Sequence, residues 1–199
     1  MKIRACTLAI SSLFIGFSVT AQADVILDTF GSTGGGFDQA LSYTINTNDV
    51  VDRPFSVNGT YSLDSIDVAL IGFGSDLVQL DLCSDDAGNP GSIIESFSIL
   101  TNPGTTMIYS VTSVLQPVLS TGNYHLKMSM DSDSAGWCWT TNPGVKPIDF
   151  SFDQGATWHL QNTVDITTRI TATAVVPEPA SFAVLGLGAF ALIRRRRTA

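Results

Sequence analysis

The chain has 199 residues and a formal net charge of −8, but its charges are unevenly distributed. Residues 24–176 carry four basic and 17 acidic side chains, a formal charge of 4 − 17 = −13. A surface this acidic repels phosphate backbones, so nucleic acid is not expected as a partner. The length suits one domain flanked by processing segments.

The first 23 residues have the three parts of a secretory signal peptide. Lys2 and Arg4 give a charged start, residues 8–19 are mostly apolar, and Ala21-Gln22-Ala23 is a small-residue cleavage pattern. We expect a signal helix over residues 1–23, export by the Sec machinery, and a mature chain that begins at Asp24.

Residues 24–174 predict an all-β domain. Stretches such as 61–73, 77–83, 92–100, 124–130 and 164–175 alternate apolar and polar residues, and Gly, Pro, Asn and Asp separate them. In 124–130, for example, Leu126 and Met128 face one way, while His125 and Lys127 face the other way, towards the surface. Strands that are apolar on one face bury it by pairing two sheets, so the pattern predicts an antiparallel, jelly-roll-like β-sandwich.

Two cysteines remain after removal of the signal peptide. Cys83 ends one expected strand, and Cys138 lies in another. An even pair of cysteines in an exported chain favours a disulfide, because oxidising compartments allow it to persist. Two free, buried thiols are the alternative.

The stretch "MDSDSAGWCWTT", residues 130–141, contains a candidate calcium loop. Asp131 and Asp133 alternate, and Gly136 follows at the sixth position. The fifth position is Ala135 and the twelfth is Asn142, where an EF-hand needs oxygen ligands and a bidentate Glu. We therefore expect a solvated acidic loop and no cofactor, with a Ca²⁺ site of another type as the alternative.

The same stretch places two tryptophans on either side of Cys138. In a strand, Trp137 and Trp139 point to the same face. If that face is exposed, the two rings are candidates for stacking on sugar rings. The alternative is that they cover the core.

The motif "SFDQGATW", residues 151–158, predicts a structured hairpin turn. Ser151, Asp153, Gly155 and Trp158 match a pattern that resembles the Asp-box of sialidases and other β-proteins. Asp153 is expected to accept hydrogen bonds from turn amides, Gly155 to supply a positive φ, and Trp158 to pack under the turn. We interpret the motif as structural.

The sequence offers no catalytic constellation. Neither His125 nor His159 has a metal-ligand spacing, and a G-x-S-x-G nucleophile elbow is missing from the sequence. We therefore expect a protein that is not an enzyme. A secreted glycan-acting hydrolase with two carboxylates and a Ca²⁺-stabilised adhesion module remain alternatives.

The C-terminal 25 residues combine a short motif, an apolar stretch and a basic cluster. Pro177, Glu178 and Pro179 come first, 14 mostly apolar residues follow (180–193), and Arg194, Arg195, Arg196 and Arg197 come next. As a helix the apolar stretch spans about 21 Å, less than the ~30 Å hydrocarbon core of a bilayer. The arginines favour a cytoplasmic end, which places residues 24–174 outside.

This order of features resembles the PEP-CTERM sorting signal, here residues 175–199. The resemblance implies an exosortase substrate of the Gram-negative cell envelope or extracellular matrix, held briefly in the inner membrane by the C-terminal helix. The stretches 53–72 and 80–94 are similar to choice-of-anchor domains of the R type. Together these resemblances imply a structural or carbohydrate-associating component of the exopolysaccharide layer.

Overall fold

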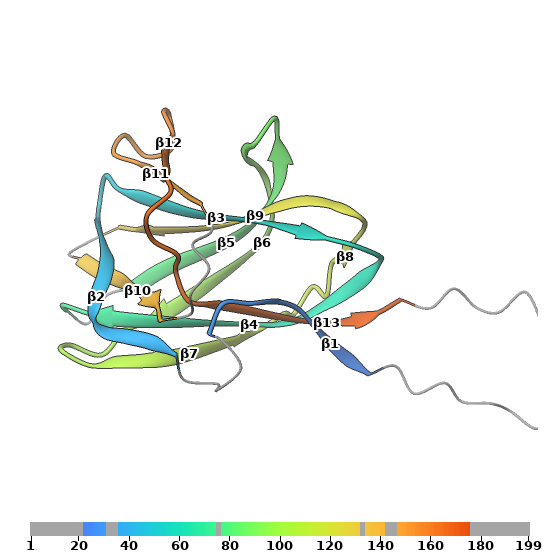
Figure 1. Ribbon diagram of the computed structural model, residues 1–199, viewed down its shortest axis with the longest axis horizontal. Helices are drawn as coiled ribbons and strands as arrows, with labels where there is room; N and C mark the ends of the chain where they lie inside the picture. The colour runs from blue at the N-terminus through green and yellow to red at the C-terminus, as the bar shows by residue number, and fades with distance from the viewer. Residues whose placement is uncertain (1–21, 31–35, 75–76, 132–133, 142–146, 176–199) are drawn as a thin grey trace, which may run out of the picture.

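The computed structural model describes residues 22–30, 36–74, 77–131, 134–141 and 147–175. Two antiparallel sheets pack face to face (Figure 1), which confirms the predicted all-β sandwich. The jelly-roll connectivity is a finer expectation that this arrangement does not establish. The helices expected over 1–23 and 180–193 lie outside the described residues, apart from Gln22 and Ala23.

The first sheet is built around one long strand. Its strands are β1 (Ala23–Asp28), β2 (Phe37–Asn46), β4 (Tyr61–Gly72), β7 (Thr106–Thr112), β8 (Val118–Leu119), β10 (Ser134–Thr140) and β13 (Thr168–Ala174). Strand β4 pairs with β13, β10, β7 and β8, while β1 pairs with β13 and β2 with β10. The pairing of β1 with β13 brings the two ends of the described chain together.

The second sheet has the strand order β12-β11-β3-β9-β5-β6. Its strands are β3 (Val50–Val57), β5 (Leu77–Asp86), β6 (Asn89–Leu100), β9 (Gly122–Met130), β11 (Ile148–Ser151) and β12 (His159–Gln161). Strand β9 lies between β3 and β5, which are distant in sequence. This pairing creates the site described below.

The core lies between the sheets and follows the predicted alternation. Leu126 and Met128 of β9 are buried there together with Leu63 and Ile66 of β4. Full burial of such a side chain stabilises the fold by about 1.5–3 kcal/mol relative to exposure. The alternation in 124–130 therefore assigned the inward face of β9 correctly.

One ion pair is also buried between the sheets. Arg53 shares the inward face of β3 with Val51 and Phe55, and its Nη1 lies 2.6 Å from Oδ1 of Asp165. Both side chains are almost fully buried. Asp165 belongs to the segment that leads into β13, so the ion pair connects the two sheets.

The predicted disulfide between Cys83 and Cys138 is wrong. Both cysteines are free and buried, and they lie on the outward faces of different sheets. Cys83 of β5 is paired in register with His125, and Cys138 of β10 packs beside Phe30 and Ala69. Burial raises the pKa of Cys83 to about 11 and that of Cys138 to about 12, so both remain thiols at neutral pH.

Gly136, the sixth position of the candidate calcium loop, has a packing role in β10. A Cβ at this position would lie 2.2 Å from Ser42 Oγ and 2.8 Å from Ile71 Cγ2, on the strands at either side. We expect Gly136→Ala to destabilise the fold by about 1–3 kcal/mol through overpacking. Urea unfolding would measure this loss. The matched control is Gly122→Ala in β9, where the nearest atom to a new Cβ is 3.9 Å away. An equal loss of stability in the two variants would exclude the proposed clash.

Candidate functional site: a pocket beside His125

Polar side chains form a row across the outward face of the second sheet. The strand register places Asp149 of β11 beside Asp52 of β3, Asp52 beside Lys127 of β9, and Lys127 beside Asp81 of β5. Lys127 Nζ lies 3.1 Å from Asp81 Oδ2. Directly opposed side chains in antiparallel strands have Cβ atoms about 5 Å apart, so these charges interact.

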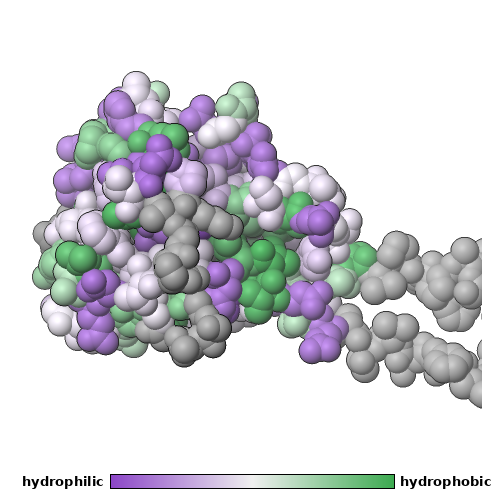
Figure 2. Space-filling view, viewed as in Figure 1, coloured by the Kyte–Doolittle hydropathy of each residue, from purple (hydrophilic) through white to green (hydrophobic). Residues whose placement is uncertain are grey.

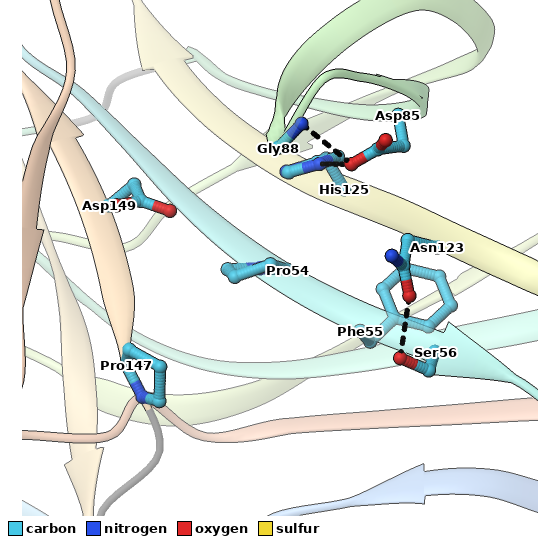
Figure 3. A pocket seen from close by; sticks show the side chains of 9 residues that line it. All are labelled: Pro54, Phe55, Ser56, Asp85, Gly88, Asn123, His125, Pro147 and Asp149. Carbon is cyan, nitrogen blue, oxygen red and sulfur yellow. Dashed lines mark hydrogen bonds and ion pairs between the residues drawn. The ribbon is translucent and has the colours of Figure 1, made fainter.

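His125 lies on the same face of β9, two residues before Lys127, and is held by two carboxylates. Its Nδ1 lies 2.5 Å from Asp52 Oδ2, and its Nε2 lies 3.0 Å from Asp85 Oδ1. Asp85 also accepts a hydrogen bond from the backbone N–H of Gly88, so the turn between β5 and β6 folds over the imidazole (Figure 3). A protonated imidazole can donate to both carboxylates at once.

The pKa values at this site are shifted by burial and by neighbouring charges. Burial lowers the pKa of His125, but hydrogen bonds to Asp52 and Asp85 and the charges of these groups outweigh it and raise the pKa. Burial raises the pKa of Asp52 to about 6, although His125 opposes this shift. Burial also raises the pKa of Asp149. His125 therefore holds its proton more firmly than a free imidazole does.

A pocket of about 300 Å³ opens beside His125 (Figure 3). Strands β3, β9 and β11 and the β5–β6 turn contribute to its wall. The lining residues are Pro54, Phe55, Ser56, Asp85, Gly88, Asn123, His125, Pro147 and Asp149. Apolar ring faces and hydrogen-bonding groups thus share one concave surface, as in small-ligand sites.

Sequence reasoning placed His125 outward but missed its burial and its partners. The alternation in 124–130 gives the correct face of β9. The burial comes from Asp52 and Asp85, which lie 73 and 40 positions away in the sequence, and which the sheet register brings together. The sequence contains one local signal of a turn that could reach over the sheet. It is the carboxylate of Asp85 followed by Gly88 at the end of a strand.

The two tryptophans lie on the core side of β10. Trp137 is fully buried, and its Nε1 donates a 2.7 Å hydrogen bond to the carbonyl oxygen of Thr167. Trp139 is half-buried against the same core. Because Trp137 has no exposed ring face, the pair cannot form the glycan-stacking surface suggested as a candidate, and the alternative role in the core applies.

The Asp-box-like residues form the turn between β11 and β12. Ser151 Oγ donates to Asp153 Oδ1 over 2.7 Å and accepts from the Gly155 backbone N–H over 2.8 Å. Asp153 accepts hydrogen bonds from the backbone N–H and hydroxyl of Thr157. Hydrogen bonds from Ser151 and Thr157 lower the pKa of Asp153 to about 2. Gly155 has φ +90°, and Trp158 lies against it, so the motif acts as a structural turn.

Of the two candidate calcium ligands, Asp131 lies within the described residues and shares a cavity with one other acid, Asp49. Asp131 lines a separate cavity of about 220 Å³ with Asp49 and Lys127, and Asp133 lies outside the described residues. The ammonium group of Lys127 disfavours a cation in that cavity. Within the described ranges, no group of three or more His, Cys, Asp or Glu side chains could hold a metal ion.

The C-terminal residues match a known family model. Residues 175–197 match the PEP-CTERM protein-sorting motif, which implies an exported protein that exosortase sorts to the cell surface and processes. The match includes Pro177, Glu178, Pro179 and the arginines 194–197, all outside the described residues. It does not extend over residues 24–174, so the choice-of-anchor resemblance remains a prediction. No curated protein matches the chain.

The structure adds one observation about the membrane. None of the residues that it describes belongs to a helix long and apolar enough to cross a bilayer.

Proposed function

We propose that the chain is a non-catalytic component of the extracellular polymer layer and that the His125 pocket binds a sugar unit of that polymer. The observation that carries this proposal is the composition of the pocket wall. Pro54 and Pro147 offer apolar ring faces for a sugar, while Ser56, Asn123 and Asp149 offer partners for hydroxyl groups. Sec-dependent export and exosortase processing would deliver the domain to that layer.

The charge of the pocket favours neutral or amino sugars over uronic acids. Asp52 and Asp85 flank one imidazolium, so one negative charge remains from the three groups, and Asp149 adds another when ionised. A uronate carboxylate would be repelled at this surface, whereas an ammonium group would be attracted. The acidic charge of residues 24–176 acts in the same direction.

Retention on immobilised native exopolysaccharide tests this proposal. We expect Asp149→Asn and Asn123→Ala each to weaken binding roughly tenfold, a loss of ~1.4 kcal/mol. Asn123→Ala removes a polar contact, and Asp149→Asn replaces one acceptor oxygen by an NH2 donor and removes the charge. Asp86→Asn is the matched control, since Asp86 is exposed at the end of β5, beside Asp85, but does not line the pocket. Unchanged retention of both pocket variants would contradict sugar binding at this site.

A second candidate function, glycan hydrolysis, is favoured by one observation. Asp85 and Asp149 line the same pocket, and burial raises the pKa of Asp149, as a general acid requires. In the retention experiment, new reducing ends released by the native protein and not by Asp149→Asn would support hydrolysis. Retention without new reducing ends would support binding alone.

A further inference from the structure

The end of the sandwich that holds both chain ends also holds an exposed apolar loop. At this end of the sandwich, Ala23 of β1 is paired with Thr173 of β13, and Thr173 with Ser62 of β4. Ser62 is paired in turn with Val118 of β8. With strands about 4.8 Å apart, β8 lies about 10 Å from the strand where the described chain ends. Figure 1 shows β8 at the same end of the molecule as the ends of β1 and β13.

The loop between β7 and β8, together with the first residue of β8, presents three aliphatic side chains to solvent. Val114 is 87% exposed, Leu115 67% and Val118 59%. Exposed aliphatic residues that are adjacent in sequence and clustered in space mark an interaction surface more than a scattered apolar residue does. Figure 2 shows that apolar surface also lies near the ends of β1 and β13.

A buried carboxylate fixes the shape of this loop. Glu95 of β6 accepts a 2.6 Å hydrogen bond from the Ser113 hydroxyl, and bonds of 2.8 and 3.0 Å from the backbone N–H groups of Val114 and Leu115. Glu95 is almost fully buried and belongs to the other sheet. The loop that exposes Val114 and Leu115 is thus held by the body of the sandwich.

The sequence after Val175 indicates what lies against this loop. Residues 176–179 separate Val175 from the apolar stretch 180–193, which four arginines follow. Five peptide steps span at most about 18 Å, so a bilayer that holds the apolar stretch lies within that distance of the strand end. The backbone N–H of Val175 is bonded to the carbonyl oxygen of Thr60, which fixes the chain to the fold up to this point.

We propose that Val114, Leu115 and Val118 insert into the lipid interface while the C-terminal tail is still attached. The short tether gives the loop a high effective concentration at the bilayer, so three aliphatic side chains suffice for contact. The contact is apolar, because residues 24–176 are too acidic to bind anionic lipid. It would hold the sorting motif, residues 177–179, at the membrane surface in one orientation.

Fluorescence quenching in lipid nanodiscs tests this proposal. The exported chain, with its tail intact, carries an environment-sensitive dye on Leu115→Cys or, as the matched control, on Leu160→Cys. Leu160 is 60% exposed on β12, away from the chain ends (Figure 1), and the native Cys83 and Cys138 are buried from the reagent. Lipid-borne nitroxide is expected to quench the dye at residue 115 several-fold more than at residue 160.

Two outcomes would overturn the proposal. One is equal quenching at the two positions. The other is strong quenching at residue 115 that survives Val114→Ser with Val118→Ser, because these changes remove the remaining aliphatic side chains. Both side chains are exposed, so the double variant is expected to fold with unchanged stability. Raising the salt concentration should leave quenching at residue 115 unchanged if the contact is apolar.

Discussion

Arg53→Met is expected to reduce the free energy of unfolding by about 3–5 kcal/mol, because it removes a cationic partner from the buried carboxylate of Asp165. Arg53 Nη1 lies 2.6 Å from the Asp165 carboxylate, between the two sheets. Water is largely excluded there, so solvation of the carboxylate compensates little for the loss of the guanidinium charge. Urea unfolding at pH 7 would measure the loss.

Two further variants separate the ion pair from other causes. Arg169→Met is the matched control, because Arg169 pairs with Asp28 and Asp67 on partly exposed surface, where such pairs contribute at most about 1 kcal/mol. Arg53→Met combined with Asp165→Leu should recover much of the loss, since both charges leave the core. If Arg53→Met lowers the free energy of unfolding by no more than Arg169→Met does, the buried ion pair does not hold the two sheets together as described.

The sequence was sufficient to predict which residues of a strand share a face. Alternation in 124–130 separated Leu126 and Met128 from His125 and Lys127, and the sandwich buries the first two in its core. Trp137 and Trp139 were likewise assigned to one face. This succeeds because side-chain direction in a strand depends only on the backbone period of two.

The same rule could not identify which faces meet. Cys83 and Cys138 both lie on outward faces, but those faces belong to different sheets, so the disulfide expected from export alone cannot form. Trp137 shares its face with the core and has no surface for a ligand. Sheet membership depends on long-range pairing, which local patterns do not encode.

The candidate site was missed for this reason. Its wall draws on β3, β9, β11 and the turn after β5, four separate parts of the chain. His125 acquires its role only when the register places it beside Pro54 and Cys83 and the turn brings Asp85 above it. The role of Arg53 was missed for the same reason. An arginine on the core face needs a buried carboxylate to pair with, and that carboxylate, Asp165, lies 112 positions further along the sequence.

His125→Ala is expected to lower the free energy of unfolding by about 3 kcal/mol at pH 6, and by less at pH 9. In the native protein the imidazole donates to Asp52, which is fully buried, and to Asp85. Removing it leaves the Asp52 carboxylate with an uncompensated burial cost. Part of this cost is relieved when Asp52 takes up a proton, since burial already raises its pKa to about 6.

The pH dependence follows from the direction of the His125 shift. Because the folded-state pKa of His125 is raised above that of the unfolded chain, about 6.5, its contribution is fully present below pH 6.5. It is lost as the pH rises through the folded-state pKa. Asp52 acts in the same direction at lower pH, between about 4 and 6, because its pKa is also raised. Native stability should therefore fall with rising pH above 6.5, while the pH dependence that remains in His125→Ala should come from Asp52, whose pKa the imidazole no longer lowers.

Sugar binding should show the same pH dependence if the pocket is the binding site. A neutral imidazole has only one N–H and cannot donate to Asp52 and Asp85 together. Asp85 is the more exposed partner, so it and the turn at Gly88 are expected to be released first, which removes one wall of the pocket. Retention on exopolysaccharide should then weaken above the folded-state pKa of His125, in parallel with the loss of stability. Retention that is constant from pH 6 to 9 while stability falls would separate the binding surface from the His125 pocket.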